Sequence, residues 1–147
     1  MRTTLPALAV AAAIAVAAPA AAQPEAVSTD AAPAAIGPYS QAILAGDTLY
    51  LAGQIAIDPA TGELAPGTIE AETRLVLENL EAVLAAADMT MANVVSTTVF
   101  MADLEEFPRM NEVYATFFGD APPARATVEV ARLPRDVKIE ISAVAVR

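Results

Sequence analysis

Alternating apolar positions predict a chain rich in strands. Ala45, Gly46 and Asp47 separate two such stretches and predict a tight hairpin turn. Gly53 interrupts the apolar row after that turn, which indicates a β-bulge or a close backbone approach. The segments with a period of two, or with a run of β-branched residues, are 42–44, 48–57, 94–101, 124–131 and 137–146.

Two further segments have helical spacing. The first begins at Thr68, a suitable N-cap with an acidic first turn behind it. The second has Pro108 in its first turn, extends to Phe118 and ends at Gly119. The first helix is about five turns long, and its apolar stripe consists of Val76, Leu80, Val83, Leu84 and Ala87.

These elements follow one another in the order ββαβαββ. We therefore predict a single α+β domain in which both helices pack on the strongly apolar face of a mixed β-sheet. The other face is expected to carry polar residues among aliphatic ones, namely Arg125, Thr127, Glu129, Glu140 and Ser142. Because this mixture is too apolar for a purely solvated face, it predicts an interface between subunits with a polar site inside it.

The N-terminus has the composition of a secretory signal peptide. Arg2 precedes an alanine-rich apolar run, and small residues lead up to Ala22. We predict a signal peptide at 1–22, a flexible Ala/Pro-rich leader at 23–35 and an ordered domain at 36–147. The mature protein would then be periplasmic or secreted and free of the membrane. An uncleaved anchor is the alternative, but the apolar run is short and weakly hydrophobic for a membrane span.

The amino-acid composition excludes several kinds of catalytic and metal-binding site. The chain has no cysteine and no histidine, which excludes thiol nucleophiles, histidine bases and nearly all transition-metal sites. The formal net charge is −10, and a small domain this acidic repels nucleic acid. We therefore expect a site built from carboxylates, arginine, hydroxyls and backbone groups, with no metal, no cofactor and no nucleic-acid partner.

The last two predicted strands carry an arginine and a glutamate. If 124–131 and 137–146 form an antiparallel pair, Arg125 lies diagonal to Glu140 on one face. A guanidinium offers a planar fork to a carboxylate, and a glutamate orients water or moves protons. Such a pair suits the hydrolysis of an imine. Taken by itself, the spacing is explained more commonly by a structural cross-strand ion pair.

Three motifs extend this interpretation. They are residues 34–41 (AAIGPYSQ), residues 52–55 (AGQI), and residues 123–134 together with 137–141 (PARATVEVARLP and VKIEI). Each resembles a motif of the RidA family, also called YjgF, whose small proteins hydrolyse reactive enamines and imines. The resemblance extends from about Ala32 to Arg147.

The resemblance implies a chorismate-mutase-like fold and a homotrimer with its sites in the clefts between subunits. It implies that Arg125 binds the carboxylate of a small 2-imino or enamine acid, and that Glu140 helps to hold the attacking water. These two are the expected catalytic residues. The expected substrate-binding residues are Tyr39, Ala52, Gly53, Asn111 and Thr127.

The chain departs from the family pattern at two of these positions. Many members have serine where this chain has Ala52, and cysteine where it has Thr127. Ala52 removes a hydroxyl, whereas Thr127 keeps a small polar group but cannot act as a thiol. Both changes bear on the rate and the range of substrates more than on the class of reaction.

We therefore expect a 2-iminobutanoate/2-iminopropanoate deaminase-like hydrolase, which converts reactive 2-enamine or 2-imino acids to 2-keto acids and ammonia in an exported compartment. The alternative is a non-catalytic trimer that binds small carboxylates or a partner protein. A holdase for unfolded chains is a third interpretation, and the acidic composition fits it less well.

Overall fold

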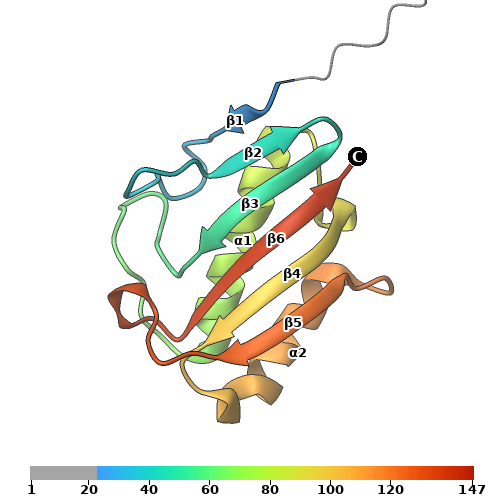
Figure 1. Cartoon of the computed structure of the whole chain (residues 1–147). Coiled ribbons are helices and arrows are strands. Elements are labelled where there is room, and N and C mark those ends of the chain that lie inside the picture. Colours follow the sequence, from blue (N-terminus) through green and yellow to red (C-terminus); the bar gives the residue numbers. More distant parts are fainter. Residues whose placement is uncertain (1–22) are drawn as a thin grey trace, which may run out of the picture.

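In the computed structural model, which describes residues 23–147, one mixed sheet carries two helices on one of its faces (Figure 1). The strands are Glu25–Val27 (β1), Ala42–Ala45 (β2), Thr48–Gln54 (β3), Val94–Met101 (β4), Ala124–Glu129 (β5) and Ile139–Val146 (β6). The helices are Ile69–Ala86 (α1) and Phe107–Phe118 (α2), and short 3-10 turns cover Met91–Asn93, Leu104–Glu106 and Pro134–Asp136. The α+β architecture expected from the sequence is confirmed.

The strands lie side by side in the order β1-β2-β3-β6-β4-β5. β2 and β3 form the predicted hairpin, and Gly46 in the turn has a φ of 61°, a conformation that favours glycine. α1 connects β3 to β4, and α2 connects β4 to β5. The pairing of β4 with β5 is parallel, which requires such a crossover, and the other pairings are antiparallel.

Both helices form where the sequence predicts them. The Thr68 hydroxyl caps α1 by accepting a hydrogen bond from the Ala71 amide at 3.3 Å, and the whole predicted apolar stripe is buried. Pro108 lies in the first turn of α2, and Gly119 ends that helix with a φ of 55°. Neither helix in the described part of the chain combines the length and the apolar character that crossing a membrane requires.

The expectation that ordered structure begins near Ile36 is wrong. β1 starts at Glu25 and pairs antiparallel with β2, where Ala26 lies opposite Ile43. Ala32 is buried in the core as well. The pattern failed here because a three-residue edge strand in an Ala/Pro-rich stretch has no readable periodicity. The predicted signal peptide at 1–22 lies outside the described residues and stays a prediction.

The expected pairing of the last two strands is also wrong. β5 pairs with one side of β4, where Arg125 lies beside Thr97, and β6 pairs with the other side, where Glu140 lies beside Phe100. The antiparallel hairpin was expected because strands adjacent in sequence usually pair. Here the connection at 130–138 passes the end of β4 instead, so β4 separates the two strands.

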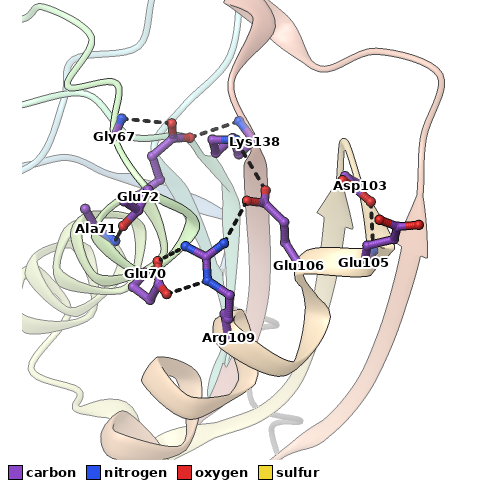
Figure 2. A network of polar contacts seen from close by, with 10 residues as sticks. Gly67, Glu70, Ala71, Glu72, Asp103, Glu105, Glu106, Arg109 and Lys138 are labelled. Atoms are coloured by element: carbon purple, nitrogen blue, oxygen red, sulfur yellow. Dashed lines mark hydrogen bonds and ion pairs between the residues drawn. The ribbon is translucent and has the colours of Figure 1, made fainter.

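A buried carboxylate on α1 fixes the start of β6. Glu72 is 3% exposed and accepts hydrogen bonds from the amides of Gly67, at 3.2 Å, and Lys138, at 2.9 Å (Figure 2). Two backbone donors therefore share one buried charge, which stabilises the charge in the absence of a cation. Lys138 directly precedes β6, so Glu72 positions the strand that carries Glu140.

An ion-pair network beside Glu72 joins the two helices. Arg109 on α2 pairs with Glu70 on α1 at 2.6 Å and with Glu106 at 3.4 Å (Figure 2). The hydrogen bond from Arg109 holds the pKa of Glu70 at about 2. Because these groups are open to solvent, the network contributes little to stability compared with the buried Glu72.

We expect Glu72→Ala to lower the free energy of unfolding by about 2–4 kcal/mol, because two backbone amides lose a charged acceptor. Urea denaturation measures the change. Glu78→Ala is the matched control, because Glu78 is an exposed glutamate on the same helix and its removal should cost less than about 0.5 kcal/mol. Equal losses in the two variants would show that Glu72 does not anchor Lys138.

Candidate functional site

The two catalytic candidates lie on opposite faces of the sheet. Arg125 is in register with Thr97, which is buried beneath the helices, and Thr127 shares that face because it lies two residues further along β5. Glu140 follows the buried Ile139 and points to the open face. The diagonal Arg125–Glu140 contact expected from the sequence is therefore wrong within one chain, and so is the placement of both residues on one face.

A pocket of about 340 Å³ contains one half of the predicted site. It opens between the N-terminal segment and the ends of β3 and β6, and four predicted residues meet in it: Tyr39, Ala52, Gly53 and Glu140. The remaining lining is mainly apolar and comes from Pro33, Ala34, Ile36, Gln54, Ile55, Ile57 and Pro134. The structure thus brings together residues that are up to 101 positions apart in the sequence (140 − 39).

Gly53 leaves the space that the Glu140 carboxylate occupies. The register of β3 against β6 shifts between Leu51 and Gln54, which is the bulge that the sequence indicated. A Cβ atom at Gly53 would collide with the Glu140 carboxylate, so only glycine leaves room for this contact. The predicted bulge at Gly53 is confirmed, and the group that approaches the glycine closely is the side chain of Glu140 rather than another stretch of backbone. Burial raises the pKa of the Glu140 carboxyl above its ordinary value.

Tyr39 closes one side of the pocket. Its hydroxyl accepts a hydrogen bond from the Ile36 amide at 3.3 Å, and its own amide bonds the Gly37 carbonyl at 2.9 Å. The side chain is 49% exposed, so the ring has one side free for a ligand. Tyr39 therefore both holds the backbone of the N-terminal segment through Ile36 and lines the pocket.

Arg125 belongs to a separate half of the site. Its guanidinium lies over the ring of Tyr114, 4.4 Å from the centroid, and over that of Phe107 at 5.4 Å. Stacking on two rings of α2 orients the fork without neutralising its charge. Within residues 23–147 no carboxylate forms an ion pair with Arg125. The guanidinium can therefore accept a carboxylate from outside the chain.

Tyr114 supports this arrangement from the core. It is buried, and its hydroxyl shares a 2.7 Å hydrogen bond with Thr97, the residue beside Arg125 in the sheet. Burial raises the pKa of the Tyr114 hydroxyl, so the tyrosine stays neutral beneath the arginine. The contact between Tyr114 and Arg125 was not predicted from the sequence. The seven-residue spacing of Phe107 and Tyr114 (114 − 107), which puts both on one helical face, was the available signal.

Asn111 and Thr127 extend the second half of the site. Asn111 lines an open hollow of about 380 Å³ together with Arg125 and Tyr114. Thr127 lies with Arg125 and Phe107 at a second, shallower surface. The Thr127 hydroxyl oxygen is buried and has no hydrogen-bond partner within the described residues. A polar group left in this state favours the approach of a further donor or acceptor.

The described residues contain no cluster of three or more acidic side chains that could hold a metal ion. What the arrangement offers is a fixed guanidinium on one face and a partly buried carboxylate in a mainly apolar pocket on the other. A guanidinium can bind an anionic group, and a carboxylate whose pKa is raised by burial is a stronger base than an ordinary glutamate.

Known proteins are similar to most of this chain. A protein-family model described as endoribonuclease L-PSP matches residues 29–147. The chain belongs to this family. A RutC family protein of Pyrococcus horikoshii is 54% identical over 82% of this chain and 96% of its own length. A 2-iminobutanoate/2-iminopropanoate deaminase of Mus musculus is 48% identical over 82% of this chain and 90% of its own length.

A solved relative confirms the fold of this L-PSP/RidA-family chain. RidA from the Antarctic bacterium Psychrobacter sp. superposes with a TM-score of 0.81, at 40% identity, over 84% of this chain and 99% of its own. The fold is the chorismate-mutase-like fold of the RidA proteins, and the resemblance read from the three motifs is confirmed. The names of the relatives differ, however, since they include endoribonuclease, RutC and deaminase.

We expect the raised pKa of Glu140 to appear in the pH dependence of stability. The native state holds this proton to a higher pH than the unfolded chain, whose glutamates titrate near about 4.3. The contribution of Glu140 to stability is therefore present below that value and is lost as the pH rises through the folded pKa. Glu140→Gln should remove this loss, so the stability of wild type relative to the variant should fall with rising pH. Urea denaturation at several pH values measures it, and a constant difference would contradict the shift.

Proposed function

We propose that the protein hydrolyses reactive 2-enamine and 2-imino acids to 2-keto acids and ammonia. The observation that carries this proposal is Arg125, a guanidinium stacked on two rings with no carboxylate partner among residues 23–147. Such a fork suits the carboxylate of a small amino-acid derivative. The name of the 48% identical mouse relative, a 2-iminobutanoate/2-iminopropanoate deaminase, supports the same reaction.

The reaction needs a water, a proton acceptor and a proton for the leaving nitrogen. An enamine first becomes the imine by taking up a proton at its β-carbon and losing one from nitrogen. Water then adds to the carbon of the C=N bond, and the electron pair of that bond moves to nitrogen, which takes up a proton. The C–N bond of the resulting amino alcohol then breaks, which releases ammonia and leaves the ketone. Glu140, whose pKa is raised by burial, can orient the water and accept its proton. No step requires a metal or a cofactor.

A second copy of the chain would unite the two halves of the site. Because Arg125 and Glu140 lie on opposite faces, no single chain presents both to one small substrate. The open face also exposes large apolar side chains, among them Tyr50 and Val128. Exposed apolar surface of this kind favours association. We therefore include a homotrimer with sites in the clefts between subunits in the proposal.

The family description, endoribonuclease L-PSP, also suggests cleavage of RNA as a function. This chain fits that activity poorly. Its formal net charge is −10, which opposes the approach of a polyanion, and it contains no histidine to act as the usual acid or base. The half-sites offer one stacked arginine and a mainly apolar pocket. They suit a small, singly charged acid better than a phosphodiester chain.

We expect the chain to compete with semicarbazide for an imino acid produced by an amino-acid oxidase. Arg125→Ala should lower kcat/KM at least roughly tenfold, because a charged hydrogen bond of about 1.5–3 kcal/mol is lost. Arg74→Ala, which removes an exposed arginine from α1, is the matched control and should keep wild-type activity. If wild type does not compete for the imine, the alternative of a non-catalytic carboxylate-binding protein replaces the proposal.

Co-expression tests whether two subunits share each site. If Arg125 and Glu140 come from different chains, an equal mixture of Arg125→Ala and Glu140→Ala subunits rebuilds about a quarter of the sites, because each site draws two chains at random. Activity should then reach about a quarter of the wild-type value, although each variant alone retains about a tenth or less. No recovery in verified mixed assemblies would exclude the shared site.

We further propose that the protein acts in an exported compartment, on the basis of the sequence of residues 1–22. Its substrates would then come from imine-forming reactions outside the cytoplasm, such as the oxidation of amino acids. We expect mass spectrometry of the protein from its native host to find Gln23 as the first residue. A chain that retains Arg2 would contradict the cleaved signal peptide.

A further inference from the structure

We propose that Gln41 is a positioning residue that latches the N-terminal segment over the pocket and thereby sets the affinity for substrate. In the sequence, Gln41 is the last residue of the motif at 34–41, and it is not among the predicted site residues. The effect on substrate binding rests on the proposed function. The latch itself rests on the hydrogen bonds of the Gln41 side chain.

The side-chain amide of Gln41 makes all of its hydrogen bonds to the backbone of residues 29–33. The side chain is buried at 4% exposure, and its Oε1 atom accepts a 2.6 Å hydrogen bond from the Thr29 amide. The two hydrogens of its Nε2 group are shared among three carbonyls, those of Thr29 at 3.0 Å, Ala32 at 3.2 Å and Pro33 at 2.7 Å. One side chain thus satisfies four backbone groups of a segment that has no regular structure beyond β1.

The latched residues lead directly into the wall of the pocket. Pro33 accepts a hydrogen bond from Gln41 and lines the pocket itself, and Ala34, Ile36 and Tyr39 follow on the same wall. The backbone carbonyl of Gln41 also accepts a 3.0 Å hydrogen bond from the Ala52 amide, on the β3 side of the pocket. Gln41 therefore ties the wall to the strand that faces it across the cavity.

Apart from the Gln41 side chain, the burial of Ala32 and Pro33 holds only the start of this wall. Ile36 is 66% exposed and Tyr39 is 49% exposed, so their burial adds little. The hydrogen bond between the Tyr39 hydroxyl and the Ile36 amide lies within the wall and does not tie it to the sheet. On the N-terminal side, β1 contributes only three paired residues. Loss of the latch should therefore open the wall locally and leave the sheet folded.

An opening wall weakens binding without altering the chemistry. If the closed wall is populated only about a tenth of the time, the apparent dissociation constant rises about tenfold, whereas the bound complex reacts as before. KM should therefore rise and kcat should stay nearly constant. A purely structural role for Gln41 would lower stability and leave both constants unchanged.

The test uses Gln41→Met in the full chain, since methionine keeps the length of the side chain and removes its four side-chain hydrogen bonds, while the backbone bond to Ala52 stays. The matched control is Asn93→Ala, which also removes amide-to-backbone bonds, to Val146 and Thr90, at the opposite end of the sheet. In Gln41→Met we expect KM to rise about tenfold with kcat within about twofold of wild type. We also expect faster amide hydrogen exchange over residues 33–39, and neither change in Asn93→Ala.

Two results would overturn the latch. One is an unchanged KM in Gln41→Met, and the other is unchanged exchange over 33–39. A wild-type protein that does not turn over the imine would defeat the proposed function instead. In that case the binding of 2-oxobutanoate, measured by calorimetry, replaces KM, and the latch stands only if Gln41→Met weakens that binding and Asn93→Ala does not.

Discussion

The position of β6 between β3 and β4 determines on which face of the sheet each candidate catalytic residue lies. As the central antiparallel strand, β6 places Ile139 and Ile141 in the core under α1 and turns Glu140 to the open face. The same arrangement pushes β5 to the edge, where Arg125 faces α2. Glu72 fixes the start of β6 through the Lys138 amide, so a buried carboxylate that does not line the pocket helps to set where Glu140 lies.

Keeping Arg125 and Glu140 apart within one chain has an electrostatic benefit. Had the two side chains met across a hairpin, they would have formed an ion pair and neutralised each other before any substrate arrived. Aromatic stacking orients the guanidinium instead, and the glycine at position 53 gives the carboxylate its room. Each group stays available to a small molecule that carries both an acid and an imine.

Much of the fold and part of the site could be predicted from the sequence. Local signals sufficed for the hairpin at Gly46, the Thr68 cap, the stripe of α1 and the bulge at Gly53, because each depends on neighbouring residues alone. The insertion of β4 between the last two strands depends on competition among distant segments, which a pattern in one segment does not record. Phe107 and Tyr114, the two rings on which Arg125 stacks, lie on a helix outside the motifs, and this contact was not predicted for the same reason.

The N-terminal strand also bears on how the protein avoids self-association. Without β1, the backbone amides and carbonyls of β2 would form an open sheet edge, and an unpaired edge invites other strands to add to it. β1 covers that edge with only three residues, and the chain then turns away through Pro33, which has no amide hydrogen to offer. The segment that walls the pocket is therefore also a guard against edge-to-edge aggregation.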